Sequence, residues 1–271
     1  MIMQANVYQT NGKVEKKITL PKVFEKSYNE GIIKRALLSE QSTRYQPQGH
    51  YLLAGLQTTA TYVGRYSTYR TLRHVGQAIR PRQKLAKGSM GDVRRIPSSV
   101  KGRRAHPHKI EKNIVERINR KEYVSALESA IAGTANPEVV RKNHVYKGET
   151  FPIVVSADIE KIAKTKDLLK VLEALSLMED VEKSHDPKAK VGMRRKVQRR
   201  YFRNSLLIVA KDAALLSKSG RNIPGVAVSS VSGLDIEKLA PGANPRLTVW
   251  SESAIPEIEA SVSKARPKCA A

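Results

Sequence analysis

Thiol chemistry is nearly absent from this 271-residue sequence, because Cys269 is its only cysteine. A single thiol excludes an internal disulfide, a zinc ribbon and a thiolate-bound cluster. The sequence also lacks a run of about 18 uncharged apolar residues, which excludes a transmembrane helix. Its opening residues, MIMQANVYQTNGK, lack the basic and then apolar order of a secretory signal. We therefore expect a soluble, cytoplasmic protein with no membrane partner.

Motifs that bind nucleotides or activate a nucleophile are missing as well. The sequence contains no G-x-G-x-x-G after a strand, no G-x-x-x-x-G-K-S/T and no G-x-S-x-G. An enzyme acting on RNA, such as a methyltransferase, would need a glycine-rich first turn that is not present. His106 and His108 form an H-x-H pattern between lysines, which favours an RNA contact over a metal site. We expect no catalytic residue, no metal and no cofactor, and hence no enzyme.

Acidic residues are scarce where basic residues are concentrated. The whole chain has a formal net charge of +24, and residues 41–110 hold 14 Lys and Arg against Asp92 alone. Residues 187–203 add eight Lys and Arg with no acid, so the remaining residues carry a net charge of only +3. A nearly neutral body with two basic segments is typical of a protein whose partner is a polyanion.

These two segments supply the candidate RNA-binding residues. Arginine dominates them, and its planar guanidinium binds two phosphate oxygens at once and stacks on bases. The candidates are Arg44, Tyr45, Gln46, Gly49, Arg65, Arg70, Arg73, Arg80, Arg82, Lys84, Lys87, Arg94, Arg95, Lys101, Arg103, Arg104, His106, His108, Lys109, Lys188, Lys190, Arg194, Arg195, Lys196, Arg199 and Arg200.

The nearly neutral body alternates strand and helix patterns. Short apolar runs predict strands at 4–9, 152–156, 205–211, 226–231 and 247–251. Helical patterns cover 28–43 after the N-cap Asn29, 110–133, a short stretch from Pro137, a helix capped by Asp158 that includes Leu175, 212–219, 234–240 and a stretch from Glu252. This alternation predicts an α/β fold: a mostly parallel sheet flanked by helices, with Rossmann-like layering but no dinucleotide motif.

We expect one globular α/β domain, 1–43 plus 110–265, followed by a tail at 266–271. The insertion at 44–109 has no helical or strand period and is rich in glycine and proline, so it cannot bury itself. Its five tyrosines alternate with arginines, which suits base stacking, although a small core of their own is an open alternative. Residues 187–203 form a second basic segment that is expected to contact RNA. The alternative is a cationic surface helix that faces phosphate or a lipid headgroup.

Three stretches of the sequence carry a resemblance to a known family. They are YQPQGHYLLAGLQTTA at 45–60, KGRRAHPHK at 101–109 and RNIPGVAVSSVSGLDIEKLAPGANPRLTVWSESAI at 221–255. In this order they resemble the large-subunit ribosomal protein L4 family, in its archaeal and eukaryotic form. The sequence differs from the family pattern at Lys101, at His108 and over 65–74. The resemblance therefore does not define the path of the middle of the insertion.

The resemblance implies a structural constituent of the large ribosomal subunit. It implies an α/β body and a long extended basic loop that penetrates the large-subunit rRNA, aids subunit assembly and lines part of the peptide exit tunnel. The implied partners are rRNA, neighbouring large-subunit proteins and the nascent peptide, with no homo-oligomer expected. The alternative is a stand-alone basic protein that binds RNA or DNA or acts as an RNA chaperone, which explains the charge but not the stretch at 221–255.

Overall fold

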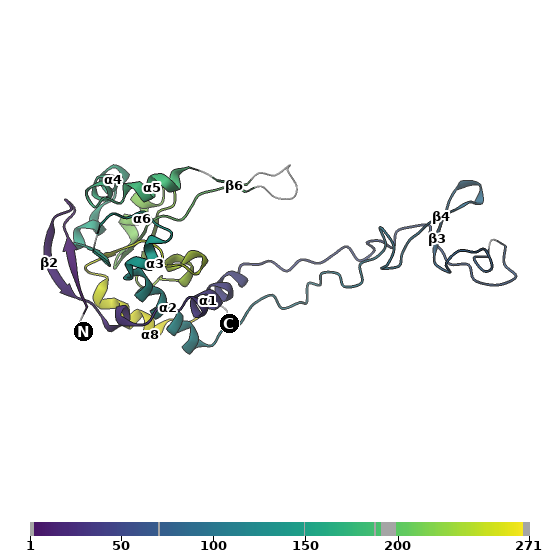
Figure 1. Ribbon diagram of the computed structural model, residues 1–271, viewed down its shortest axis with the longest axis horizontal. Coiled ribbons are helices and arrows are strands. Elements are labelled where there is room, and N and C mark those ends of the chain that lie inside the picture. The colour runs from purple at the N-terminus through teal and green to yellow at the C-terminus, as the bar shows by residue number, and fades with distance from the viewer. Residues whose placement is uncertain (1–2, 70, 149, 187, 191–198, 268–271) are drawn as a thin grey trace. The chain divides into compact units, whose positions relative to one another are not determined.

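A computed structural model describes residues 3–69, 71–148, 150–186, 188–190 and 199–267 (Figure 1). The chain divides into two compact units. We call residues 1–44 and 115–271 the globular unit and residues 45–114 the basic unit.

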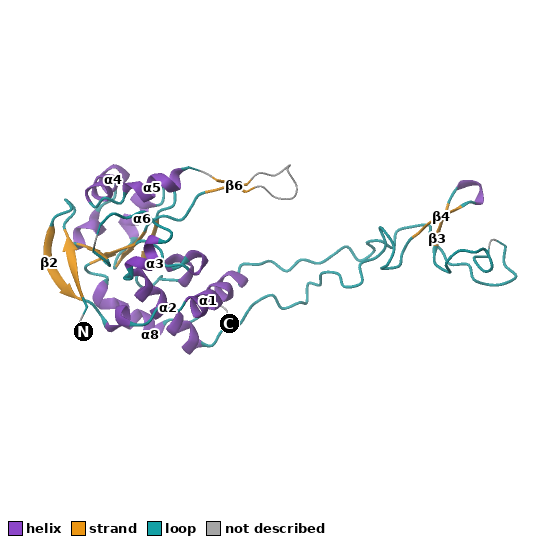
Figure 2. Ribbon diagram, viewed as in Figure 1, coloured by secondary structure: helices purple, strands orange, loops and turns teal. Residues whose placement is uncertain are grey.

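A six-stranded sheet forms the centre of the globular unit (Figure 2). Its strands are β1 (Gln4–Tyr8), β2 (Val14–Thr19), β5 (Ile153–Val155), β8 (Leu207–Ala210), β9 (Ala227–Ser230) and β10 (Thr248–Ser251). They lie in the order β2-β1-β5-β10-β8-β9. Only the β1–β2 pair is antiparallel, and the other neighbouring pairs are parallel. The predicted α/β class with a mainly parallel sheet is therefore confirmed.

Both faces of the sheet are buried, because alternate residues of each central strand enter different hydrophobic cores. In β5, Val154 packs into one core while Ile153 and Val155 pack into the other. In β10, Trp250 and Val249 divide in the same way. Every residue of β5, β8 and β10 is buried, which is why these strands read as unbroken apolar runs in the sequence.

The first core lies under α1 (Glu30–Ser42), α2 (Arg120–Thr134), α7 (Ile236–Leu239) and α8 (Ile258–Lys264), with the short 3-10 turns η1 (Lys22–Glu25), η4 (Pro241–Ala243) and η5 (Ile255–Glu257). Helix α1 begins after Asn29, whose side chain accepts hydrogen bonds from the backbone N–H groups of Gly31 and Ile32. The predicted apolar stripe of this helix is confirmed by the burial of Ile33, Ala36 and Leu37.

The second core lies under α3 (Pro137–Arg141), α4 (Thr165–Ala174), α5 (Met178–His185) and α6 (Ala214–Gly220), with the 3-10 turn η3 (Ala157–Lys161). In Figure 1, α4, α5 and α6 lie on one side of the sheet and α1, α2 and α8 on the other. The globular unit thus has three layers, with the sheet between two layers of helices.

Short elements complete the described structure. The basic unit contains β3 (Arg82–Lys84), the 3-10 turn η2 (Ala86–Gly88) and β4 (Met90–Val93), with β3 and β4 paired antiparallel. In the globular unit, β6 (Lys188–Lys190) pairs antiparallel with β7 (Arg199–Tyr201).

Several expected boundaries are wrong. The helix expected from 110 begins only at Arg120, and the preceding segment is not helical. Its isoleucines mimic a helical period, yet Ile110 is 65% exposed and only Ile118 enters the core. Asp158 lies inside η3 instead of capping a long helix, which starts later, at Thr165. Strand β2 and helix α5 were not expected, because their sequences are mostly polar.

A buried carboxyl group joins three helices of the first core. Glu40 of α1 is 2% exposed. It accepts hydrogen bonds from the hydroxyl of Tyr123 in α2 at 2.5 Å and from the backbone N–H groups of Ile236 and Glu237 in α7 at 3.2 and 3.0 Å. These bonds satisfy donors at the start of α7 that the helix itself leaves unpaired.

We predict that Glu40→Ala lowers the free energy of unfolding by about 3 kcal/mol, because it removes the buried acceptor to which one hydroxyl and two backbone N–H groups donate. Urea unfolding at neutral pH measures the change. Glu173→Ala, at an exposed position of α4, is the control and should change stability by less than about 0.5 kcal/mol. Equal losses in the two variants would contradict the assigned role of Glu40.

Candidate nucleic-acid interface

The two ends of the basic unit run alongside each other. The ring Nδ1 of His50 lies 3.1 Å from the backbone oxygen of His108. Further along, the guanidinium of Arg95 donates to the backbone oxygen of Ala60 at 3.3 Å. Thr61 and Arg82 then exchange two backbone hydrogen bonds and form a bridge beside β3. The side chains of His50 and Arg95 therefore join the outgoing segment 45–61 to the returning segment 95–108.

A glycine allows this close approach. Gly55 has a φ of +76°, in the left-handed region that favours glycine. A Cβ atom placed on it would lie 2.5 Å from the carbonyl carbon of Gly102 on the returning segment, so a side chain at Gly55 would force the two segments apart. A Cβ on Gly102 would lie 1.9 Å from the backbone oxygen of Ile96, so a side chain there would disrupt the turns between Ile96 and Gly102 within the returning segment.

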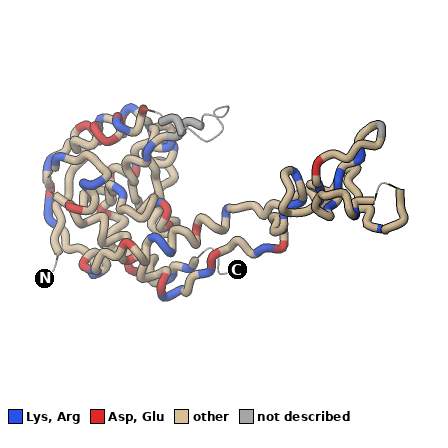
Figure 3. The backbone as a smooth tube through the Cα atoms, turned by 45° about the vertical axis from the view of Figure 1, so that its right-hand side comes forward, with Lys and Arg blue, Asp and Glu red and all other residues tan. Residues whose placement is uncertain are grey.

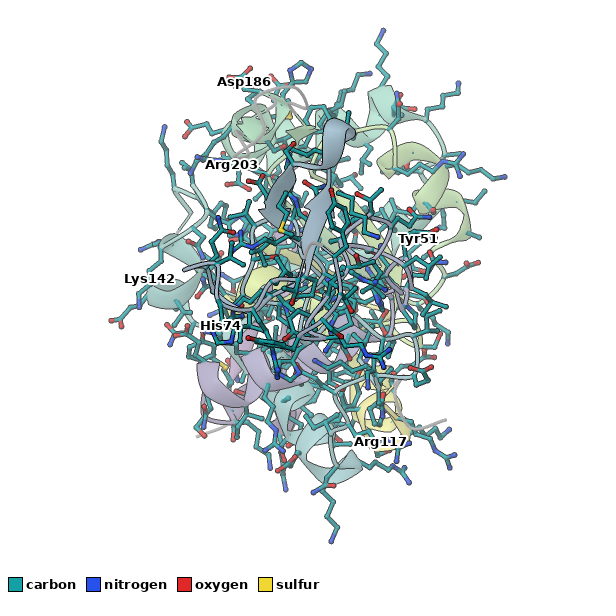
Figure 4. The ribbon with its side chains drawn as sticks, turned by 90° about the vertical axis from the view of Figure 1, so that its right-hand side faces the viewer. Tyr51, His74, Arg117, Lys142, Asp186 and Arg203 are labelled. Carbon is teal, nitrogen blue, oxygen red and sulfur yellow. The ribbon has the colours of Figure 1, made fainter. Side chains whose placement is uncertain are left out.

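The basic unit buries almost nothing apolar. Among its described residues only Ala60 and Leu72 are buried hydrophobics, and neither belongs to the two cores of the globular unit. The five tyrosines at 45, 51, 62, 66 and 69 are all exposed, from 46% for Tyr62 to 82% for Tyr69. The alternative of a small tyrosine core is therefore wrong. Figure 4 labels Tyr51 and His74, two exposed side chains of this unit.

Lys and Arg outnumber Asp and Glu along the basic unit (Figure 3). Residues 45–114 hold 14 Lys and Arg, and their only acids are Asp92 and Glu111. The exposed cations are Arg65, Arg73, Arg80, Lys84, Arg95, Lys101, Arg103, Arg104, Lys109 and Lys112. Tyr45, Gln46, Gly49, His106 and His108 are exposed on the same two segments.

A few of the candidate cations already have partners within the chain. Arg94 bonds to the carboxylate of Asp92 at 3.0 Å and to the backbone oxygen of Val100 at 2.7 Å. Arg44, at the end of the globular unit, donates to Glu237 at 3.0 Å. Lys87 lies in η2, and Arg70 lies outside the described residues.

The second basic segment is a hairpin in its described part. Strand β6 carries Lys188 and Lys190, and β7 carries Arg199 and Arg200, with Lys190 opposite Arg199. The expected alternative of a surface helix does not hold for Arg199 and Arg200, which lie in a strand. Arg194, Arg195 and Lys196 lie outside the described residues.

A buried polar network holds the two ends of this hairpin. The carboxylate of Asp180, in α5, accepts from His144 Nδ1 at 3.0 Å, from Ser205 Oγ at 2.8 Å and from the backbone N–H of Val145 at 3.0 Å. Arg246 Nε donates to the backbone oxygen of Ser205 at 2.7 Å. Because α5 precedes β6 and Ser205 follows β7, these bonds fix the base of the hairpin.

Electrostatics in this network follow from burial and hydrogen bonding. Burial alone would raise the pKa of Asp180, but the bonds from His144, Val145 and Ser205 outweigh it and lower the pKa below its usual value. Burial lowers the pKa of Arg246 to about 10, with the charge of Asp180 opposing the shift. Arg246 therefore remains charged at neutral pH.

The network contains a serine, a histidine and an aspartate, but its geometry does not match a catalytic triad. In a triad, histidine accepts the proton of the serine hydroxyl and aspartate orients the histidine. Here Ser205 and His144 both bond to Asp180, so no base activates the hydroxyl. No pattern in the sequence indicates this network, because its members are far apart in the chain and follow no motif.

Within the described ranges, no three His, Cys, Asp or Glu side chains are grouped closely enough to hold a metal ion. None of the described helices is long and apolar enough to cross a membrane.

We predict that the free energy of unfolding decreases as pH falls below about 4, because the pKa of Asp180 is lower in the folded than in the unfolded chain. The stabilisation is present above the unfolded pKa and is lost as pH falls through the folded one. Asp180→Asn should be about 2 kcal/mol less stable at pH 7 and should lose less stability on acidification. Urea unfolding between pH 7 and 3 measures both effects.

Asp167→Asn is the matched control, since Asp167 makes only an exposed ion pair with Lys170 at 3.9 Å. It should change stability by no more than about 0.5 kcal/mol at any pH. A parallel acid dependence in wild type and Asp180→Asn would show that Asp180 does not carry this stabilisation.

Comparison with known proteins agrees with the resemblance seen in the sequence. The ribosomal protein L4/L1 family matches residues 18–261. The large ribosomal subunit protein uL4 of Methanocaldococcus jannaschii is 41% identical over 261 residues, which cover 95% of this chain and 98% of that protein. The uL4 protein of Archaeoglobus fulgidus is 42% identical over 93% of this chain and 97% of its own length.

A third archaeal relative, the uL4 protein of Methanospirillum hungatei, is 40% identical over 93% of this chain and 97% of its own length. The matches span the globular unit and the basic unit alike, since both lie within residues 18–261 for most of their length. The chain therefore belongs to the ribosomal protein L4/L1 family, a family of large-subunit ribosomal proteins that are not enzymes.

Proposed function

We propose that this protein binds large-subunit rRNA through the exposed cations of the basic unit and thereby helps the subunit to assemble. Membership of the family makes the chain a component of the large ribosomal subunit, with rRNA and other ribosomal proteins as partners. The proposal adds which part of the chain does the binding. In this proposal the insertion at 44–109 binds rRNA, and the domain 1–43 plus 110–265 is the folded part of the chain that carries the insertion.

The observation that carries the proposal is a concentration of exposed charge on a unit without a core. A unit in which only two of the described residues are buried hydrophobics gains little from folding on itself. Its arginines and lysines repel one another unless anions lie between them. Closely spaced phosphates supply such anions, and cations between them allow RNA helices to approach.

Arginine and tyrosine give the basic unit two ways of binding RNA. Contacts to phosphate hold the protein in position, while exposed rings stack on unpaired bases. The hairpin of β6 and β7 is a second contact in this proposal, carrying Lys188, Lys190, Arg199 and Arg200. The resemblance further supports a role for the basic unit in lining part of the exit tunnel, where it would meet the nascent peptide.

Sedimentation with ribosomes tests the proposal directly. After a high-salt wash, the tagged full-length chain should stay with large subunits at about one copy per subunit, because many phosphate contacts act together. A variant lacking residues 57–100 should be lost or should give defective subunits. Complete release of the full-length chain by salt would favour the alternative of a peripheral RNA- or DNA-binding protein.

Salt dependence tests the contribution of individual cations. With on the order of 8 phosphate contacts, log affinity for large-subunit rRNA should fall against log salt with a slope of about −6 to −7. Replacing Arg103 and Arg104 with Ala should make the slope shallower by about 2 units. Filter binding or fluorescence anisotropy across a salt series measures it.

The matched control replaces Lys164 and Lys166, two exposed cations of the globular unit, with Ala. It removes the same charge and should leave the slope unchanged. A slope that is equally steep in both double variants and in wild type would show that Arg103 and Arg104 do not contact phosphate.

A further inference from the structure

The basic unit contains a small cavity beside its two-stranded sheet. The cavity has a volume of about 240 Å³ and lies between β3, β4 and the segment that precedes them. Thr61, Val63, Tyr69, Leu72, Arg82 and Lys84 are among its lining residues. Ligand pockets for drug-sized molecules span roughly 300–1,000 Å³, so this cavity is sized for a smaller group.

The lining of the cavity combines three chemical properties. Leu72 is 3% exposed, and it and the half-buried Val63 provide apolar surface. Tyr69, at 82% exposed, presents a ring at the surface. Lys84 and Arg82 add positive charge from β3. An apolar surface with an aromatic ring and flanking cations is the combination that binds bases of single-stranded nucleic acid.

Arg82 adds a hydrogen-bond donor that lacks an acceptor. Its Nε is buried and has no partner among the described residues. The rest of the residue is anchored, because its backbone pairs with Thr61 and its terminal nitrogen reaches the backbone oxygen of Ala78 at 3.4 Å. A buried donor without an acceptor costs about 1–3 kcal/mol, which a ligand with an acceptor at this position would recover.

We infer that this cavity binds a single unpaired RNA base, stacked against Tyr69 and accepting a hydrogen bond from Arg82 Nε. The inference rests on the proposed function, since it names what the RNA places in one part of the basic unit. A base has both properties that the cavity requires: a flat apolar face and acceptor atoms on its edge. The phosphates of the RNA backbone next to this base carry the negative charge that complements Lys84 and the neighbouring arginines.

Two RNA hairpins that differ in one nucleotide test the inference with the full-length protein. One stem carries a single bulged 4-thiouridine, and the other has that nucleotide paired. Both should bind with salt-dependent affinity, and the bulged RNA should bind about tenfold more tightly, a ratio expected for one stacked base. Ultraviolet crosslinks from the bulged nucleotide should map by mass spectrometry to residues 61–72 or 82–90.

Point variants separate the stacking from the hydrogen bond. Tyr69→Ala should abolish the preference for the bulged RNA, while Tyr69→Phe should keep it. Arg82→Lys retains the charge but places a methylene where Nε stands, and should reduce the preference about fivefold. Leu215→Ala removes an exposed apolar side chain of the globular unit that does not line the cavity, and it should leave the preference unchanged.

The outcomes distinguish this inference from the proposed function. Equal binding of the two RNAs, or a preference that survives Tyr69→Ala, overturns the base site while leaving RNA binding by the basic unit intact. Crosslinks confined to the outgoing and returning segments would overturn it in the same way. Salt-independent or undetectable binding of both RNAs would count against the proposed function itself.

Discussion

Mutual repulsion of the cations in the basic unit is the constraint on which its structure depends. Fourteen Lys and Arg residues share this unit with two acids, and no apolar core holds them together. Instead, side-chain hydrogen bonds of His50 and Arg95 join the outgoing and returning segments, and β3 pairs with β4. Under the proposed function, rRNA phosphates supply the anions that neutralise this unit, and the binding partner then contributes to its stability.

The globular unit places its acids differently. Asp180 and Glu40 are buried and accept hydrogen bonds from several elements at once. Glu160 is half-buried, and at the ends of β8 and β10 it accepts hydrogen bonds from the backbone N–H of Lys211 at 2.9 Å and from the hydroxyl of Ser253. Burial tends to raise the pKa of Glu160, but these bonds lower it overall. Because these carboxylates are hydrogen-bonded within the globular unit, they do not neutralise the cations of the basic unit.

The buried strands could be predicted from the sequence because burial on both faces leaves an unbroken apolar run, as at 152–156 and 205–211. Strand β2 could not, since it lies at the sheet edge and its residues are largely exposed. The isoleucines that follow Ile110 have helical spacing, but most of this segment does not pack against a hydrophobic core. Without that packing, the helical spacing does not produce a helix. The cations of the candidate interface were visible as composition, whereas the Asp180 network and the cavity at Arg82 depend on contacts between distant residues.

Two hydrogen bonds close the globular unit where the basic unit leaves it. Ser39 donates to the backbone oxygen of Glu116 at 2.6 Å, and the N–H of Glu116 donates to Ser42 Oγ at 2.9 Å. Helix α1 thus binds the returning chain at Glu116 directly, and these contacts do not involve residues 45–114. Doubling the length of an inserted loop costs only about 0.6 kcal/mol in closure entropy. Evolution can therefore lengthen, shorten or rewrite the insertion to follow changes in RNA without refolding the domain that carries it.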